Sequence, residues 1–275
     1  MHFVHITDTH VNAPDREGLY HHNMGDKLRH VFAHVRESGI RPAFFVISGD
    51  LVHEGDAEDY RFLRRLLDEE TAAFGVPALV CLGNHDHRQP FREGFLGETP
   101  SEAPYYLSVT IGGLRVILLN SQVEGSSSGI IGDDQLAWLD DRLKTPAPVG
   151  SVIVLHHPML PALGLSMDDF HLTNMDEVAQ VIKGRDVIGI LAGHIHANRS
   201  GSFHGIISAA GSGSAFGLEI VQDQKVRFFD NTSYNLVTIY KGSMNVQTVT
   251  IPGRQQEWSR IPIEDVFGHE DKAGQ

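Results

Sequence analysis

The sequence predicts an α/β protein, and three observations support this prediction. Short apolar runs of strand length recur through the first two thirds of the chain, and several lack polar alternation, as in strands covered on both faces. Amphipathic stripes with helical spacing alternate with these runs. The composition, with 41% hydrophobic and 21% charged residues in a chain of 275, is ordinary for a globular protein and excludes a disordered or fibrous chain.

The strands and helices are expected in a regular order. The six apolar runs are residues 3–6, 43–47, 78–82, 114–119, 152–155 and 187–191. The four helical stripes run from Met24 to Val35 before a stop at Gly39, from Tyr60 to Leu67 after an N-cap at Asp56, over Asp133–Leu143, and over residues 174–182.

The character of the chain changes after about residue 205. Five short strands separated by turns are expected there, at residues 206–209, 219–221, 226–229, 236–240 and 246–251. No charged or Pro-rich linker divides the chain, so residues 1–267 are expected to form one domain. Residues 268–275 are polar and are expected to fray.

Charge and cysteine content restrict the partners and the cellular location. The net charge of −13 disfavours binding to a nucleic acid polymer or to an anionic membrane. The single cysteine, Cys81, excludes an intrachain disulfide and is expected to be an inert core thiol. The N-terminus has no signal-peptide pattern, and no apolar run approaches the ~20 residues of a membrane span, so a cytoplasmic location is expected.

Polar clusters directly follow five of the apolar runs. Ligands of α/β proteins bind at the carboxyl ends of strands, so five strands would deliver these side chains to one edge, a placement that core packing does not require. The clusters contain Asp8 and His10; Gly49 and Asp50; Asn84, His85 and Asp86; His156 and His157; and His194 and His196.

The residue types and their spacing indicate a metal site. Asp8 with His10, and His194 with His196, are pairs two residues apart, which point the same way in an extended backbone. Two Asp, one Asn and at least four His are too many donors for one tetrahedral metal, but they suit two adjacent metals bridged by a carboxylate. Mixed nitrogen and oxygen donors favour transition metals such as Fe, Mn, Zn or Co over Ca or Mg.

Five motifs in order give the chain a specific resemblance. Asp8-Thr9-His10, Gly49-Asp50, Gly83-Asn84-His85-Asp86, His156 and Gly193-His194-Ile195-His196 resemble the motifs of calcineurin-like metallophosphoesterases. Among these enzymes the chain is most similar to class III cyclic-nucleotide phosphodiesterases and bacterial glycerophosphodiesterases. The resemblance implies a four-layer αββα sandwich with two mixed sheets, in which the residues after about 205 complete the second sheet.

The resemblance also implies a role for each matching residue. One metal would take Asp8, His10 and His196; the second would take Asn84, His156 and His194; and Asp50 would bridge them. His85 would stabilise the transition state or protonate the leaving group, and Asp86 would orient it. Two metals about 4 Å apart would hold a bridging hydroxide for attack on phosphorus.

The expected function is the hydrolysis of small phosphodiesters, such as cyclic nucleotides. A phosphomonoesterase or nucleotide pyrophosphatase, and a metal-free scaffold, are alternatives. The stretch Leu51-Val52-His53-Glu54-Gly55 lacks the motif of Ser/Thr protein phosphatases, which disfavours that class. Residues 211–216 lack the histidine that glycerophosphodiesterases place there, although Phe216 is close by. The late strands leave room for a dimer or higher homo-oligomer.

The sequence leaves the role of His157 open and supports two further expectations. His157 is either an orienting partner of a ligand or a structural neighbour. The loop of residues 15–25 is placed to form a wall for the leaving group. The histidines expected to be solvated or locally hydrogen-bonded are His2, His5, His30, His34, His171 and His269.

Overall fold

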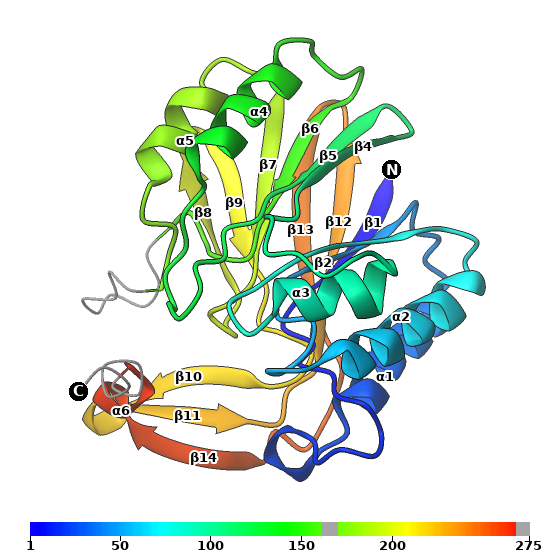
Figure 1. The fold of residues 1–275 in the computed structure, drawn as a ribbon, viewed down its shortest axis with the longest axis vertical. Coiled ribbons are helices and arrows are strands. Elements are labelled where there is room, and N and C mark those ends of the chain that lie inside the picture. The colour runs from blue at the N-terminus through cyan, green and yellow to red at the C-terminus, as the bar shows by residue number, and fades with distance from the viewer. Residues whose placement is uncertain (161–169, 268–275) are drawn as a thin grey trace.

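Two sheets face each other at the centre of the computed structural model, which describes residues 1–160 and 170–267 (Figure 1). The first sheet has the order β13-β12-β1-β2-β3, and the second has the order β4-β5-β6-β7-β9-β8. The strands of the first sheet are β1 (His2–Ile6), β2 (Phe45–Ser48), β3 (Ala78–Cys81), β12 (Ser233–Tyr240) and β13 (Ser243–Thr250). Those of the second are β4 (Leu107–Ile111), β5 (Leu114–Leu118), β6 (Gly150–Val154), β7 (Val187–Ala192), β8 (Arg199–Phe203) and β9 (Ile206–Ala210).

Both sheets are mixed: β1, β2 and β3 are parallel in the first sheet, and the four inner strands are parallel in the second. β1 pairs in parallel with β2 and antiparallel with β12. In the second sheet β5, β6, β7 and β9 are parallel, while β4 and β8 are antiparallel edge strands. Parallel strands end at the same edge of their sheet, so the arrangement gathers their carboxyl ends as the sequence predicts.

Helices cover the outer face of each sheet, which gives the four predicted layers (Figure 1). The helices α1 (Met24–Glu37), α2 (Ala57–Ala72) and α3 (Arg88–Phe91), which runs into a π-helical turn Arg92–Leu96, lie along the first sheet. The helices α4 (Asp133–Leu143) and α5 (Met175–Ile182) cover the second sheet. Asp56 caps α2 through a capping box, as its position predicts.

Alternating side chains divide the core between the layers. On β2, Val46 packs between the two sheets, whereas Phe45 and Ile47 pack under α1 and α2. On β6, Val152 packs between the sheets and Ile153 packs toward the second pair of helices. Both faces of these strands are buried, which explains why their sequences are continuously apolar.

A third, smaller sheet lies beside the two central ones (Figure 1). It has the order β10-β11-β14 and comprises β10 (Gly217–Val221), β11 (Lys225–Phe229) and β14 (Glu257–Pro262), followed by α6 (Ile263–Phe267). The expectation that all residues after about 205 complete the second sheet is therefore wrong. Only β8–β9 joins that sheet, β12 and β13 extend the first sheet, and the remaining strands form the third, whose Val226 and Phe228 pack against the α1 side of the core.

Several elements have weak sequence signals. The predicted strands and helices all occur, with ends that differ by a few residues. The strands β4, β8 and β14 and the helices α3 and α6 were not predicted; the edge strand β8, for example, has one apolar residue, Phe203. The single-domain organisation of residues 1–267 stays a prediction, and the expected frayed tail 268–275, with His269, lies outside the described residues. Within the described ranges, no helix is long and apolar enough to cross a membrane.

Candidate metal centre

The ends of five parallel strands bring seven of the predicted side chains together. Asp8 and His10 follow β1, Asp50 follows β2, and Asn84 follows β3. His156 follows β6 and the pair His194 and His196 follows β7, so the second sheet supplies the remaining donors. Asp8, His10, Asp50, His156, His194 and His196 are all buried, each with at most 8% of its surface exposed.

The donor atoms form two groups that share one carboxylate. Asp8, His10, Asp50 and His196 place one donor atom each within 4.8 Å of one another, and Asp50, His156 and His194 do the same. Asp50 Oδ2 lies 3.6 Å from His10 Nε2 and 3.3 Å from His156 Nε2. Asn84 Oδ1 lies 3.0 Å from His156 Nε2, on the side of the second group. The geometry fits two cations with Asp50 between them.

Backbone carbonyls orient two of the imidazole rings. His156 Nδ1 donates to the carbonyl of Ser48 at 2.8 Å, and His196 Nδ1 lies 3.1 Å from the carbonyl of Phe216. A carbonyl can only accept, so these Nδ1 atoms carry protons and the Nε2 atoms face the centre. Such contacts fix the ring orientation of metal-binding histidines.

The backbone is strained at the residues that supply the donors. Asp8, His10, Asp50, His194 and His196 all have positive φ angles, between 44° and 74°. Non-glycine residues adopt this left-handed region at a cost of about 1–3 kcal/mol each, and such residues cluster at functional sites. The clustering of strain in these loops indicates that their side chains are held where packing alone would not place them.

The electrostatics at Asp50 and His194 also fit a cation. Burial would raise the pKa of Asp50, but the charges of His156 and His85 outweigh it and hold that pKa well below its usual range. Burial and the neighbouring His157 lower the pKa of His194, whose Nε2 is buried and has no hydrogen-bond partner among the described residues. Neutral imidazoles and ionised carboxylates with unused lone pairs are the donors that transition metals take.

His85 stands at the opening of the centre, half-buried. Its backbone N–H donates to Asp50 Oδ1 at 3.0 Å, and its Nδ1 lies 2.8 Å from Glu54 Oε1. Burial would lower the pKa of His85, but the charges of Asp50 and Glu54 outweigh it and raise this pKa to about 9. The ring can therefore hold a proton.

Asp86 does not make the predicted contact with the His85 ring. Its carboxylate accepts hydrogen bonds from the backbone N–H groups of Leu51, Val52 and Gly83 and from the hydroxyl of Tyr60, at 2.8–3.2 Å. Burial raises the pKa of Asp86 to about 6. Asp86 therefore connects the loop that carries Asp50 to the loop that carries Asn84. The carboxylate that contacts the His85 ring is Glu54.

Sequence reasoning missed two residues next to the centre. Glu54 is one, and its only signal was its place in the loop that follows Asp50. His53 is the other; its Nδ1 lies 3.2 Å from His10 Nδ1. His157 is buried, and its Nδ1 lies 2.8 Å from Ser121 Oγ. The centroid of its ring lies 4.6 Å from that of His194, so His157 packs against a donor of the second group.

Comparison with known proteins identifies the family. The family model for calcineurin-like phosphoesterases matches residues 1–198. The chain therefore belongs to the calcineurin-like phosphoesterase family, as its motifs indicate. A solved dimetal phosphatase from Danio rerio has the same fold, with a TM-score of 0.60 and 16% identity over 92% of this chain and 99% of that one.

Curated relatives narrow the class to phosphodiesterases. The cAMP/cGMP dual specificity phosphodiesterase of Mycobacterium tuberculosis is 36% identical over 78% of this chain and 67% of its own length. The 3′,5′-cyclic adenosine monophosphate phosphodiesterase of Haemophilus influenzae is 29% identical over 74% of this chain and 72% of its own. This protein is a metal-dependent phosphodiesterase.

Proposed function

We propose that the protein hydrolyses small phosphodiesters, of the cyclic-nucleotide type, at a centre of two metals. The observation that carries the proposal is the pair of donor groups that share Asp50. Asp8, His10 and His196 would hold one metal, and Asn84, His156 and His194 would hold the other, with Asp50 between them. Fe, Mn, Zn and Co suit this donor set.

The reaction would rely on the chain's residues for position and charge. Bound metals would supply Lewis-acid chemistry, by lowering the pKa of an attacking water and by neutralising the phosphoryl oxygens. Asp50 would balance the charge of both metals and fix their separation. Its Oδ1 also accepts from the His85 backbone N–H, a contact that would keep His85 beside the phosphate of a bound substrate.

His85 would act on the leaving group. Its ring is held at Nδ1 by Glu54, which leaves Nε2 for the substrate. The Glu54 carboxylate at Nδ1 favours the protonated form of the ring, which would give a proton to the leaving oxygen. Phosphoryl transfer depends mainly on such positioning and charge stabilisation.

The substrate is proposed from the relatives and from the charge of the chain. Both curated phosphodiesterases described above carry names that refer to cyclic nucleotides. A net charge of −13 disfavours a long polyanion, whereas a single diester can be held by two cations. A cytoplasmic location, where cyclic nucleotides occur, remains part of the proposal.

Paired substrates test the proposal. Protein loaded with Mn should hydrolyse bis(p-nitrophenyl) phosphate much faster than p-nitrophenyl phosphate, and Asp50→Ala should abolish the activity. Asp68→Ala, which removes an acidic residue from the exposed part of α2, is the matched control and should keep it. A faster monoester rate would move the assignment to a phosphatase. Fewer than one metal per chain with no activity would favour a scaffold.

A further inference from the structure

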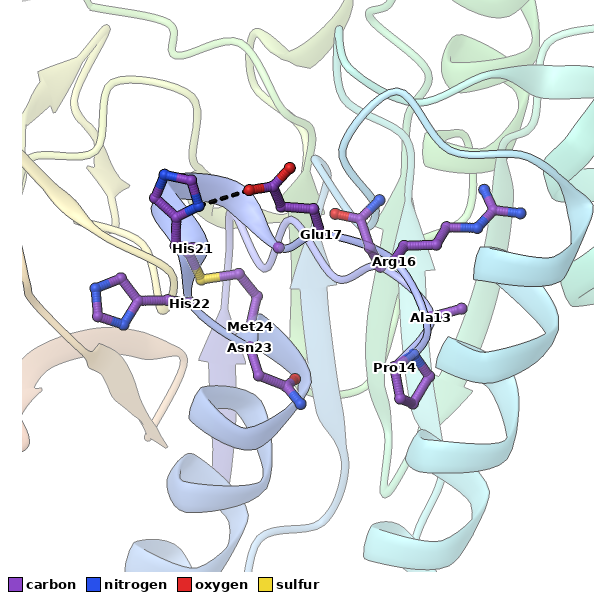
Figure 2. A pocket seen from close by; sticks show the side chains of 10 residues that line it. Ala13, Pro14, Arg16, Glu17, His21, His22, Asn23 and Met24 are labelled. Carbon is purple, nitrogen blue, oxygen red and sulfur yellow. Dashed lines mark ion pairs between the residues drawn. The ribbon is translucent and has the colours of Figure 1, made fainter.

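A pocket of about 320 Å³ opens between the loop that follows His10 and the start of α1 (Figure 2). Ala13, Pro14 and Arg16 lie on one side of it, and His21 and His22 lie on the other. Its volume falls at the lower end of the range of about 300–1,000 Å³ that small-molecule sites occupy. The chemistry proposed above makes no use of it.

The pocket adjoins the candidate metal centre. Asn12, which lines it, is two residues beyond His10. The Asn12 amide donates to the carbonyl of His53 at 3.2 Å, and His53 Nδ1 lies 3.2 Å from His10 Nδ1. Asn12 therefore places the pocket one contact away from His53 and two contacts away from the His10 ring of the centre.

The walls of the pocket are held before any ligand arrives. Asp59, which is fully buried, accepts from Arg16 at 2.6 Å and from the backbone of Ala13 at 2.8 Å. On the other side the His22 ring stacks on Trp258, with centroids 4.4 Å apart. A preformed pocket loses less conformational entropy when a ligand binds, which favours affinity.

The charged residues that line the pocket are already paired. Arg16 is paired with both Asp56 and Asp59, at 2.7 and 2.6 Å, and Glu17 is paired with His21 at 2.6 Å. Such a pocket offers no unpaired cation for a second phosphate. Asn12 Oδ1 and the His22 ring nitrogens have no hydrogen-bond partner in the part of the chain that the structure describes, so the pocket presents uncharged hydrogen-bonding groups.

We propose that this pocket binds the nucleoside part of a nucleotide diester, with Asn12 and His22 as specificity-determining residues. A nucleoside is uncharged, and its hydroxyl and amino groups can form hydrogen bonds with the uncharged polar groups of the pocket. The inference rests on the proposed function, since it places the phosphate of the same substrate at the metal centre.

Titration calorimetry with adenosine tests the pocket without any turnover. The Mn-loaded protein should bind adenosine saturably. Asn12→Ala and His22→Ala should each weaken binding about tenfold, as expected for the loss of one hydrogen-bonding group. Asp15→Ala, an exposed change in the same loop, should leave the affinity unchanged. Absence of saturable binding to the unmodified protein, or equal affinities in all variants, would overturn the proposal.

Kinetics with two diesters separate recognition from catalysis. Asn12→Ala and His22→Ala should raise KM for cyclic AMP about tenfold and change KM for bis(p-nitrophenyl) phosphate less than twofold. An equal rise in KM for both diesters would mean that Asn12 and His22 support the metal centre and do not recognise the nucleoside. That result would contradict the inference. If Asp50-dependent hydrolysis is absent for both diesters, the proposed function fails, and the adenosine titration still decides the pocket.

Discussion

Glu54 connects two histidines at the opening of the metal centre. One of its oxygens lies 2.8 Å from His85 Nδ1 and the other lies 3.0 Å from His87 Nε2. Its backbone N–H donates to the carbonyl of His85 at 3.3 Å. A carboxylate on one ring nitrogen fixes the orientation of an imidazole and stabilises its charged form, so Glu54 is a positioning residue for the proposed proton donor.

Glu54→Gln should lower kcat on bis(p-nitrophenyl) phosphate about ten- to a hundredfold. This loss is smaller than the ~10²–10⁴-fold that a general acid contributes, because His85 itself remains. KM should change less than twofold, because substrate binding depends on the metals. Glu54→Asp, which keeps the charge, should recover part of the rate. His87→Gln is the matched control and should stay near the unmodified rate. A change confined to KM would argue against the positioning role.

At the scale of elements, the loop after β3 lies directly against the loop after β2. At Gly83 the two loops are so close that only glycine fits. A Cβ on Gly83 would overlap the Asp50 carboxylate and backbone nitrogen. Gly83 also donates its N–H to Asp86 at 2.8 Å. The glycine therefore allows the loop that carries Asn84 and His85 to lie directly against Asp50.

Gly83→Ala should push the two loops apart and lower the diesterase rate at least a hundredfold. Overpacking of this kind costs roughly 1–3 kcal/mol of folding free energy, so the protein should still fold. Gly253→Ala is the control, because a Cβ there meets nothing closer than 3.9 Å. Rates measured with unfolding curves would separate the two effects; a full rate in a stable Gly83→Ala protein would contradict the argument.

The sequence shows the donor residues because each follows an apolar strand, and the ends of parallel strands converge. From that pattern alone, Asp8, Asp50 and His194 are predicted to lie in one site. It could not show Glu54, because a contact between residues 54 and 85 depends on loop conformation and on a left-handed φ of 50°. It also could not assign β14, whose residues Glu257–Pro262 lack clear alternation.

At the scale of the whole molecule, metal binding should stabilise the fold. The centre gathers buried carboxylates and imidazoles on strained backbone, and a ligand that binds only the folded state stabilises it by about 2.7 kcal/mol at a hundred times its Kd. EDTA should therefore lower the Tm by several degrees, and Mn should restore it. Asp50→Ala should show a much smaller shift. An unchanged Tm after verified metal removal would contradict this coupling.

A buried histidine far from solvent should make stability depend on pH. His5 was expected to be solvated or locally hydrogen-bonded; it is 1% exposed on β1, hydrogen-bonded across the sheet to Ser48 Oγ at 2.8 Å and to Asn235 at 3.2 Å. Burial lowers its pKa from 6.5 to about 3. The unfolded chain therefore binds more protons between these two values, and folding stability falls as the pH drops below 6.5.

His5→Gln removes this titrating group while keeping a hydrogen-bonding side chain. On lowering the pH from 8 to 5, the unmodified protein should lose about 2 kcal/mol more free energy of unfolding than the variant. Urea unfolding of both metal-free proteins measures the difference, which excludes any contribution from metal release. His2→Gln, on the exposed end of the same strand, should behave like the unmodified protein. Parallel pH dependences for His5→Gln and the unmodified protein would show that His5 does not resist protonation in the fold.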